Sequence, residues 1–446
     1  MPSTDRPAEV TRTRFLAAVR ASGVLSPEQA DRHAASLPPL LATGPQVADA
    51  LVRSGVLTRF QADRILSGKY DGLVLGQCVV LEPVAKTADS WVYKAKHRAL
   101  GRMVAVRVLA SGLTADPVRR AAFQDQARSA ARLAHPHVLT VLDVNAVGPR
   151  LYLLTEHVDG TSLDVLVGLT GPPGVGRACE YLRQAALGLQ HAHDCGVTHG
   201  RLTPAAVLVG GPAGRPAVKL AEFGFGRATA GSPVGQCPDP ADFQAPELFH
   251  PAAAPTPAAD LYALGCTLYF ALTGRVPFPG SAAEKARLHL AAEPTPVEEV
   301  RPGVPAEVAT VVRGLLAKQP DERPTAAEVA GWLARFATAD DTAERSDFDF
   351  ASPADGNTPF GSVTLTGLPA PATDPPRPSP RQGPPAEPLA DDSSPWDGLD
   401  HEPSADRVGQ VGASIGRGWL ALTGVAVAVT AAVGLTAALV LRLVAK

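Results

Sequence analysis

The chain has 446 residues, of which 45% are hydrophobic and 19% charged, so it is long enough for two or three domains with sizeable cores. Its net charge of -3 argues against a nucleic-acid-binding surface, because such domains are usually strongly basic. The five cysteines are scattered and form no CxxC pair, so they indicate neither a zinc site nor a disulfide framework, and we expect a reducing, cytosolic interior.

An internal repeat lies near the N-terminus: SGVLSPEQADR (22–32) recurs as SGVLTRFQADR (54–64), with a period of 32 residues. In each copy a glycine ends one helix and a hydroxyl residue, Ser26 or Thr58, caps the next. A glutamine three residues after each cap is typical of a capping box. Residues 1–70 are therefore predicted to form two stacked helix pairs, a small helical adaptor. The first apolar stretch is too short for a signal peptide.

Residues 76–336 alternate short apolar runs with helical patterns. A series of segments in this range is similar, in order and spacing, to the motifs of serine/threonine protein kinases: VYKA (92–95), VAVRVL (104–109), LAHPHVLTVLDV (133–144), LYLLTEHVDGTSL (151–163), HAHDCGVTHGRL (191–202), VKLAEFGFG (218–226), DFQAPEL (242–248), DLYALGCTLYFALTGRVPF (260–278) and LLAKQPDERPTAAEV (315–329). The resemblance implies an α+β, two-lobed fold with a small β-rich N-lobe and a helical C-lobe. The segment 57–76 also resembles the leader of planctomycete-type kinases.

The residues that hold this fold together are present. By the resemblance, Glu247 of the APE motif and Arg323 of DERP form a buried ion pair in the large lobe. Asp260 matches the aspartate that accepts backbone N–H groups of the catalytic loop. His199 matches the histidine that links this loop to the metal-binding turn. We expect structural roles for all four residues.

The residues that hold phosphate in the family are replaced. A glycine-rich loop lets backbone N–H groups approach the phosphates, but Ala85, Thr87 and Ser90 stand at its three glycine positions here. The phosphate-holding lysine is Arg107, and its helix partner, normally a glutamate, is Gln126. An arginine opposite a glutamine forms no ion pair, and its planar fork does not substitute for a compact ammonium.

The catalytic loop keeps the frame of the family but not its chemistry. In THGRLTPAAVLV (198–209), Arg201 stands at the position of the base aspartate and Ala206 at that of the second magnesium ligand. Glu222 replaces the aspartate of DFG, and Pro240 replaces the threonine that bonds the base. General-base assistance is worth about 10²–10⁴-fold in rate, and a cation at the base position also repels magnesium. We therefore expect no metal site, with Glu222 as the single candidate ligand.

The opposite charges of Arg201 and Glu222 predict an ion pair, because the corresponding kinase positions face the same cleft. As a charge-assisted hydrogen bond in a partly desolvated cleft, the pair would contribute about 1–3 kcal/mol. It would also fill the volume where magnesium sits.

Nucleotide binding is a separate question, because adenine could bond the hinge backbone of Glu156 and Val158 whatever the side chains are. Phosphate binding would then depend on Arg107, with Arg201 as a further candidate contact. The with-no-lysine kinases supply their lysine from the glycine-rich loop, and Lys86 and Lys94 are the candidates for such a rescue here. We expect no required cofactor, ATP as the candidate ligand of the cleft, and no magnesium.

Residues 337–416 change character. Between 340 and 406 the chain carries 14 acidic residues against 3 arginines, with prolines in runs. Few apolar residues are available to offset chain entropy, so we expect a disordered, acidic, proline-rich linker.

The segment WLALTGVAVAVTAAVGLTAALVL (419–441) is 23 residues long and has no charged residue, whereas a bilayer core needs about 20 residues. Arg417 precedes it and Arg442 follows it. We expect one C-terminal transmembrane helix rather than a buried core helix, with the kinase-like domain on the cytoplasmic side.

The sequence thus predicts a membrane-anchored pseudokinase that acts as a signalling scaffold or regulator. Its partners would be signalling proteins and, through the C-terminal helix, a membrane, but no nucleic acid. Two alternatives stay open: a low-activity or unconventional serine/threonine protein kinase that uses ATP, and a nucleotide-sensing switch without phosphotransfer.

Overall fold

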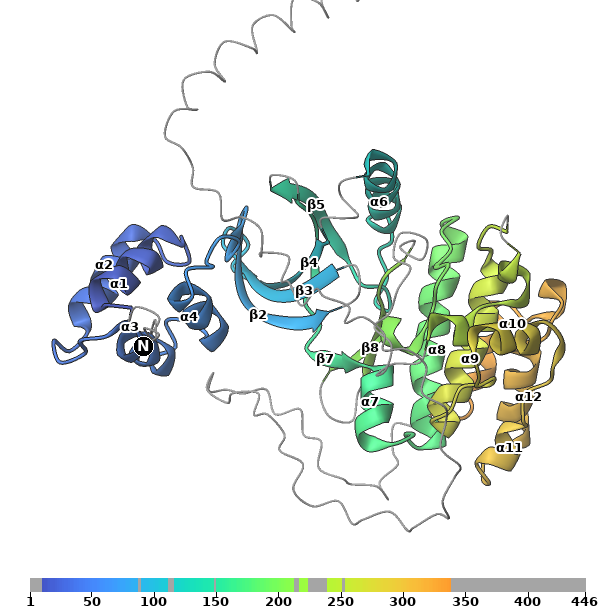
Figure 1. The fold of residues 1–446 in the computed structure, drawn as a ribbon. Coiled ribbons are helices and arrows are strands. Elements are labelled where there is room, and N and C mark those ends of the chain that lie inside the picture. The colour runs from blue at the N-terminus through green and yellow to red at the C-terminus, as the bar shows by residue number, and fades with distance from the viewer. Residues whose placement is uncertain are drawn as a thin grey trace, which may run out of the picture. The chain divides into compact units, whose positions relative to one another are not determined.

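The computed structural model describes residues 10–86, 90–110, 116–147, 150–211, 216–223, 239–250 and 253–337. Its N-terminal helices form a cluster of their own, shown in blue in Figure 1: α1 (Arg12–Ala21), α2 (Pro27–Ser36), α3 (Gly44–Arg53) and α4 (Arg59–Leu66). Each helix begins at a hydroxyl side chain that accepts a backbone N–H: Thr11, Ser26, Thr43 and Thr58. The capping boxes predicted at Ser26 and Thr58 are both present, and Thr43 begins a third.

The two copies of the repeat meet in a reciprocal pair of backbone bonds. Gly44 N donates to Val10 O at 2.7 Å, and Arg12 N donates to Ala42 O at 3.4 Å. Moving the donor Gly44 back by 32 residues gives Arg12, and moving the acceptor Val10 forward by 32 residues gives Ala42. The two bonds are therefore equivalent, as a local pseudo-twofold axis requires. The apolar faces of both copies pack into one core, whose buried members include Phe15, Val19, Val47, Leu51, Leu57, Ala62 and Ile65.

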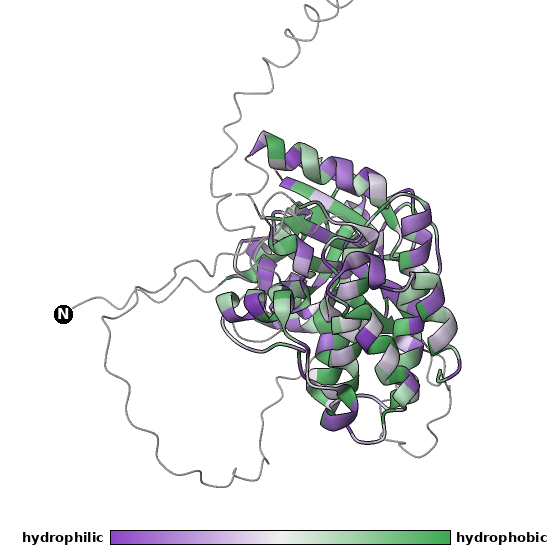
Figure 2. Ribbon diagram, turned by 90° about the vertical axis from the view of Figure 1, so that its right-hand side faces the viewer, coloured by the Kyte–Doolittle hydropathy of each residue, from purple (hydrophilic) through white to green (hydrophobic). Residues whose placement is uncertain are grey.

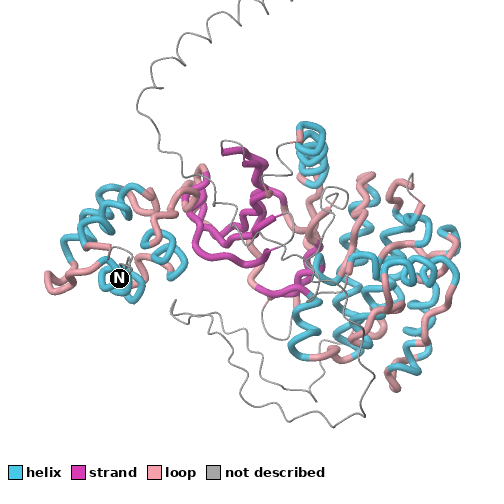
Figure 3. The backbone as a smooth tube through the Cα atoms, viewed as in Figure 1, coloured by secondary structure: helices cyan, strands magenta, loops and turns pink. Residues whose placement is uncertain are grey.

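The N-lobe is an antiparallel sheet with the strand order β1-β2-β3-β4-β6-β5. Its strands, which gather in one magenta region of Figure 3, are β1 (Val74–Leu75), β2 (Cys78–Lys86), β3 (Ser90–His97), β4 (Met103–Leu109), β5 (Val141–Val147) and β6 (Arg150–Glu156). One face of β4 packs its valines into the sheet core with Tyr93. On the other face, Leu109 packs with Phe123 of α6 (Pro117–Ala130).

The C-lobe is helical and surrounds one large apolar core. Its longer helices are α7 (Leu163–Thr170), α8 (Val175–Asp194), α9 (Pro257–Thr273), α10 (Ala282–Ala291), α12 (Ala306–Leu315) and α13 (Ala326–Leu333), with the short α11 (Val297–Val300). A small sheet of β7 (Gly160–Ser162), β8 (Val207–Gly210) and β9 (Ala217–Leu220) lies beside them. Apolar and polar residues alternate along the helices of Figure 2, as expected for helices packed on a core. The predicted two-lobed fold is confirmed.

Helix α9 is the centre of this lobe, because every residue from Ala259 to Leu272 is buried. Helix α8 packs closely against the segment between α6 and β5. A side chain at Gly188 would bring its Cβ to 2.6 Å from His137 O, so only glycine allows this approach.

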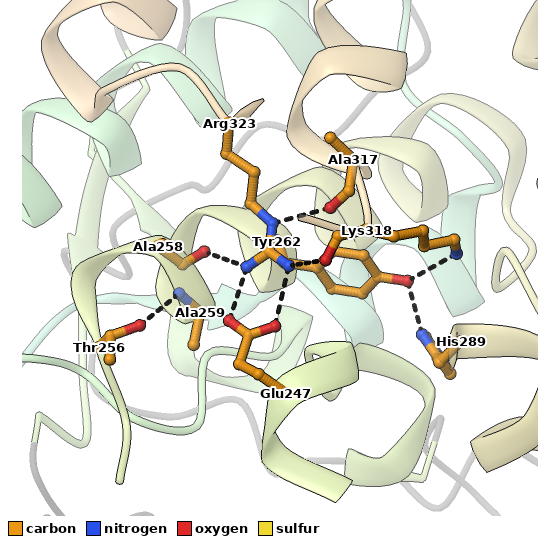
Figure 4. Close-up of polar contacts among 9 residues, drawn as sticks. All are labelled: Glu247, Thr256, Ala258, Ala259, Tyr262, His289, Ala317, Lys318 and Arg323. Carbon is orange, nitrogen blue, oxygen red and sulfur yellow. Dashed lines mark hydrogen bonds and ion pairs between the residues drawn. The ribbon is translucent and has the colours of Figure 1, made fainter. Parts of the chain in front are cut away.

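The predicted ion pair between Glu247 and Arg323 is confirmed (Figure 4). The guanidinium donates to both carboxylate oxygens, at 2.7 and 2.8 Å. It also donates to the carbonyls of Ala317, Ala258 and Lys318. The Arg323 side chain is 0% exposed, so these five acceptors replace its hydration shell.

The predicted linker beyond residue 337 and the predicted transmembrane helix (419–441) lie outside the described residues. Within the described residues, no helix has the length and apolar character to cross a membrane.

Candidate functional site

Strand β4 places Arg107 on the face of the sheet that meets α6. Its backbone lies in register with Val92 of β3 and Leu153 of β6. Because side chains alternate along a strand, Arg107 points away from the valines that flank it. Its side chain is 16% exposed, and its guanidinium donates to the Glu222 carboxylate in an ion pair.

Glu222 follows β9 in a conformation that side chains seldom adopt. Its φ is 67°, the only positive value for a residue other than glycine in the described residues. This left-handed region costs such a residue about 1–2 kcal/mol. The ion pair with Arg107 and the packing of the Phe223 ring 4.8 Å from the His199 ring oppose that cost. Burial alone would raise the pKa of Glu222, but the Arg107 guanidinium outweighs burial, and the pKa is lowered.

The predicted ion pair between Arg201 and Glu222 is wrong. Glu222 pairs with Arg107 instead, and Arg201 is the smallest of the causes that lower the pKa of this carboxyl group. The reason is position: strand register holds the Arg107 fork opposite the carboxylate, whereas Arg201 lies on a loop. Its side chain lines a cavity of about 270 Å³ together with Leu202, Pro240, Phe243, Gln244, Leu248, Pro255 and others.

Arg107 turns toward Glu222 rather than toward Gln126, the residue at the position of the family's glutamate. Gln126 lies on α6, and its Oε1 atom is buried and receives no hydrogen bond. An amide offers the guanidinium no charge, so the Glu222 carboxylate attracts it more strongly.

Ala206 contributes only backbone atoms to the site. It ends the short helix η1 (Pro204–Ala206), and its carbonyl accepts from Ala221 N at 2.9 Å. Its side chain has no oxygen, and the Glu222 carboxylate is held by Arg107, so these positions do not fit a magnesium ion, which binds through oxygen ligands. The described part of the chain contains no group of three or more His, Cys, Asp or Glu side chains that could hold a metal ion.

The catalytic-loop frame keeps the contacts that the resemblance implies. The Asp260 carboxylate accepts His199 N at 2.8 Å and Gly200 N at 2.7 Å. His199 is fully buried, and its Nε2 atom lies 2.8 Å from Ala221 O, immediately before Glu222. Burial lowers the pKa of His199, which favours the neutral imidazole. The loop is therefore fixed in place, with Arg201 and Ala206 at the positions where the family has its base and its second magnesium ligand.

The hinge residue Glu156 has a partner that the sequence did not reveal. Its Oε1 atom accepts from Thr140 N and from Lys219 Nζ, both at 2.8 Å. Burial alone would raise the pKa of Glu156, but Lys219 and Thr140 lower it. The Thr155 hydroxyl donates to Glu156 O at 3.1 Å. The other hinge candidate, Val158, lies two residues beyond β6.

The replaced glycine positions lie at the tip of the β2–β3 hairpin. Ala85 pairs with Val92 in the sheet, Ser90 begins β3, and Thr87 lies outside the described residues. The two candidate rescue lysines have other contacts. Lys94 Nζ lies 3.7 Å from a Glu82 carboxylate oxygen, and Lys86 Nζ lies 4.6 Å from the centre of the Trp91 ring.

Three contributors to the site were missed in the sequence: the Arg107–Glu222 pair, Lys219, and His193. The Nε2 atom of His193 lies 3.0 Å from Asp260 Oδ2. The alternation in β9 could have singled out Lys219, which stands between two buried residues. Nothing in the sequence indicates that Arg107 of β4 contacts Glu222 in the turn after β9, because the two residues are 115 positions apart.

Comparisons with known proteins match the kinase-like part of the chain. Residues 83–331 match the family model described as "Protein kinase domain". Serine/threonine-protein kinase PknB of Mycobacterium tuberculosis is 34% identical over 256 residues, which cover 55% of this chain and 40% of PknB. PknE of the same organism is 34% identical over 236 residues, covering 52% of this chain and 41% of PknE.

Among solved structures, the crystal structure of the M. tuberculosis PknI kinase domain is similar to this chain. It has a TM-score of 0.50 and 25% sequence identity, and the match covers 60% of this chain and 98% of the PknI chain. The chain spans about two fifths of the length of the curated relatives that it matches. Since the family model matches more than half of its residues, the chain belongs to the protein kinase domain family.

Proposed function

We propose that this member of the kinase family is a pseudokinase that serves as a signalling scaffold on a membrane. The observation that carries the proposal is the ion pair between Arg107 and Glu222. In it, the residue at the phosphate-holding position neutralises the residue at the metal-binding position. Each is then unavailable for the charge that phosphoryl transfer requires it to bind.

The remaining parts of the site support the same proposal. Arg201 puts a cation where a base is needed, and Ala206 offers no oxygen to a second metal ion. Phosphoryl transfer depends almost entirely on positioning and charge neutralisation, so independent losses multiply. In contrast, the Glu247–Arg323 pair and the Asp260 contacts are complete. A fold that keeps its structural contacts without its chemistry is suited to binding.

A phosphotransfer assay on the full chain tests the proposal. The expected result is no magnesium-dependent transfer from ATP to the chain itself or to a generic serine/threonine substrate. Arg107→Ala and Glu222→Ala serve as controls for a contaminating kinase, because contamination would survive both substitutions. Transfer by the wild-type chain that disappears in both variants would establish the alternative, a low-activity serine/threonine kinase.

The hinge favours a second candidate function, a nucleotide-sensing switch without phosphotransfer. The backbone of Glu156 and Val158 supplies hydrogen-bonding groups that an adenine can use, and the salt link between Lys219 and the Glu156 side chain stiffens this stretch. ATP is therefore the candidate ligand, with Arg107 as its candidate phosphate contact. A rise in thermal midpoint with ATP, absent with GTP, would favour the switch.

The cytoplasmic, membrane-anchored placement is part of the proposal. It rests on the uncharged segment 419–441, which has the length of a membrane span. Partners are proposed to be signalling proteins, which the kinase-like domain would gather at the membrane surface.

A further inference from the structure

The second copy of the N-terminal repeat holds a strand of the N-lobe. The Thr58 hydroxyl donates to Leu81 O of β2, and Gln61 Nε2 donates to Val80 O at 2.6 Å. Gln61 is only 2% exposed. Helix α4 thus donates to two successive main-chain carbonyls of β2, and the Val79 side chain of this strand packs into the core of the N-terminal helices.

The first copy has counterparts of both donors, but no strand of the described residues lies on it, and the hydroxyl of its cap Ser26 donates to Glu28 Oε2 at 2.8 Å. Ser26 and Gln29 are the counterparts of Thr58 and Gln61, 32 residues earlier. In both copies the glutamine Oε1 accepts from the backbone N–H of the cap, at 2.9 Å. This bond directs the amide Nε2 atom away from the helix end. Gln29 is exposed, and its Nε2 atom has no acceptor among the described residues.

A groove of about 510 Å³ lies at this position of the first copy, and we call it the first-repeat groove. One wall comes from the kinase-like domain, where the Arg98 guanidinium donates to Gly23 O. The groove therefore lies at the strand-binding position of the repeat. It is lined by Arg20, Gly23, Leu25, Ser26, Pro27, Gln29 and Arg98.

We propose that the first-repeat groove binds an extended, strand-like segment of a partner protein through that segment's main-chain carbonyls. The contact between α4 and β2 is the precedent: Gln29 Nε2 would donate to a carbonyl of the partner as Gln61 Nε2 donates to Val80 O. The inference rests on the scaffold function proposed above and names a surface for it. Recognition by main-chain groups gives affinity, and the side chains beside them give selectivity.

The differences between the two copies define the chemistry of the partner. In the second copy, the Phe60 ring lies 6.0 Å from the Tyr93 ring of the N-lobe. Its counterpart in the first copy is Glu28, which is exposed, and the hydrogen bond from Ser26 lowers the pKa of Glu28. Glu28 lies outside the groove lining, so its carboxylate offers an ion pair to a lysine or arginine of the partner at the edge of the groove. Leu25 adds a partly buried apolar surface for a neighbouring apolar side chain.

Fluorescence anisotropy on the full chain tests the proposal. The probe is a labelled peptide with the β2 sequence Cys78–Lys86, in which Cys78→Ser removes the thiol and Glu82→Lys adds a cation. Gln29→Glu keeps an oxygen that accepts from the N-terminus of α2, but it replaces the outward-pointing NH2 group by an oxygen, which cannot donate to a peptide carbonyl. The affinity for the peptide should therefore weaken about tenfold. Gln46→Glu is the matched control, because Gln46 is the exposed capping-box glutamine of α3 and lies outside the groove. Its affinity should equal that of the wild type.

Absence of peptide binding, or equal weakening by Gln29→Glu and Gln46→Glu, would overturn the proposal. So would assignment of the groove to another occupant. Dimerisation that Gln29→Glu abolishes in sedimentation would assign it to a second copy of the chain. Faster hydrogen exchange of residues 338–446 in Gln29→Glu would assign it to the chain's own C-terminal part. None of these results bears on the phosphotransfer assay, so the two proposals fail separately.

Discussion

Arg107 and Glu222 illustrate how two longer side chains change a site. Each stands where the family has a shorter or more compact group, a lysine and an aspartate. Together they meet as an ion pair, in which the fork of Arg107 can donate in one plane. Glu222 has a positive φ in this turn, and its carboxylate pairs with Arg107.

At the same scale, Arg323 should be the most costly arginine to lose. Arg323→Ala leaves the Glu247 carboxylate without its partner in a mostly buried site, and we expect a loss of about 3–5 kcal/mol in the free energy of unfolding. Urea denaturation measures it. The matched control is Arg313→Ala, which breaks an exposed pair with Glu298 and should cost less than about 1 kcal/mol. Equal costs would contradict the buried-pair assignment.

His289 predicts a specific loss of stability in acid. Burial, Lys318 and Lys285 lower its pKa from 6.5 to about 4. In the unfolded chain the His289 imidazole is therefore protonated below pH 6.5, whereas in the folded chain it is protonated only near pH 4. Stability should fall between these values as pH decreases, by up to about 3 kcal/mol. In His289→Asn, the slope of unfolding free energy against pH in this window should flatten; an unchanged slope would refute the assignment.

At the scale of elements, the contact between α4 and β2 makes a helix pair part of the kinase-like domain. Gln61→Glu should loosen it, because a carboxylate would face Val80 O in a site where Gln61 is 2% exposed. Backbone amides of β2 should exchange hydrogen faster than in the wild type, and stability should fall by about 1–3 kcal/mol. Gln46→Glu again provides the control, since its side chain is exposed. Unchanged exchange in β2 would contradict the docking contact.

Local elements could be predicted from the sequence because their causes are local. The caps at Ser26 and Thr58 need only residues within one helical turn. The Glu247–Arg323 pair could be inferred only from the family resemblance. The partner of Glu222 could not be inferred, because two cations compete for one carboxylate. Strand register, set by pairing with β3 and β6, decides in favour of Arg107.

Docking between elements was the least predictable part of the molecule. The repeat predicted two equal helix pairs, and the internal bonds of the two copies are alike. Their outer contacts differ because only the second copy continues directly into β1 and β2. A single sequence shows that two copies are similar, but not which one is covered.

At the scale of the whole molecule, the C-terminal segment should decide where the chain resides. A chain truncated after Asp406 should remain in the soluble fraction, whereas the full chain should sediment with membranes. Val427→Arg in the full chain places a charge in the middle of 419–441, costs about 2.5–3.5 kcal/mol of insertion free energy, and should weaken membrane association. Identical partitioning of the full and truncated chains would disprove the anchor.

The magnesium dependence of ATP binding tests the central claim most directly, because the claim is that Arg107 occupies the carboxylate which a metal ion would need. The measurement is the thermal midpoint of the full chain with ATP, with and without magnesium, for the wild type and for Arg107→Ala. In the wild type, any rise of the thermal midpoint with ATP should be the same with and without magnesium. In Arg107→Ala, the Glu222 carboxylate is released, and the rise with ATP should become larger when magnesium is present. A larger ATP shift with magnesium in the wild type would contradict the account.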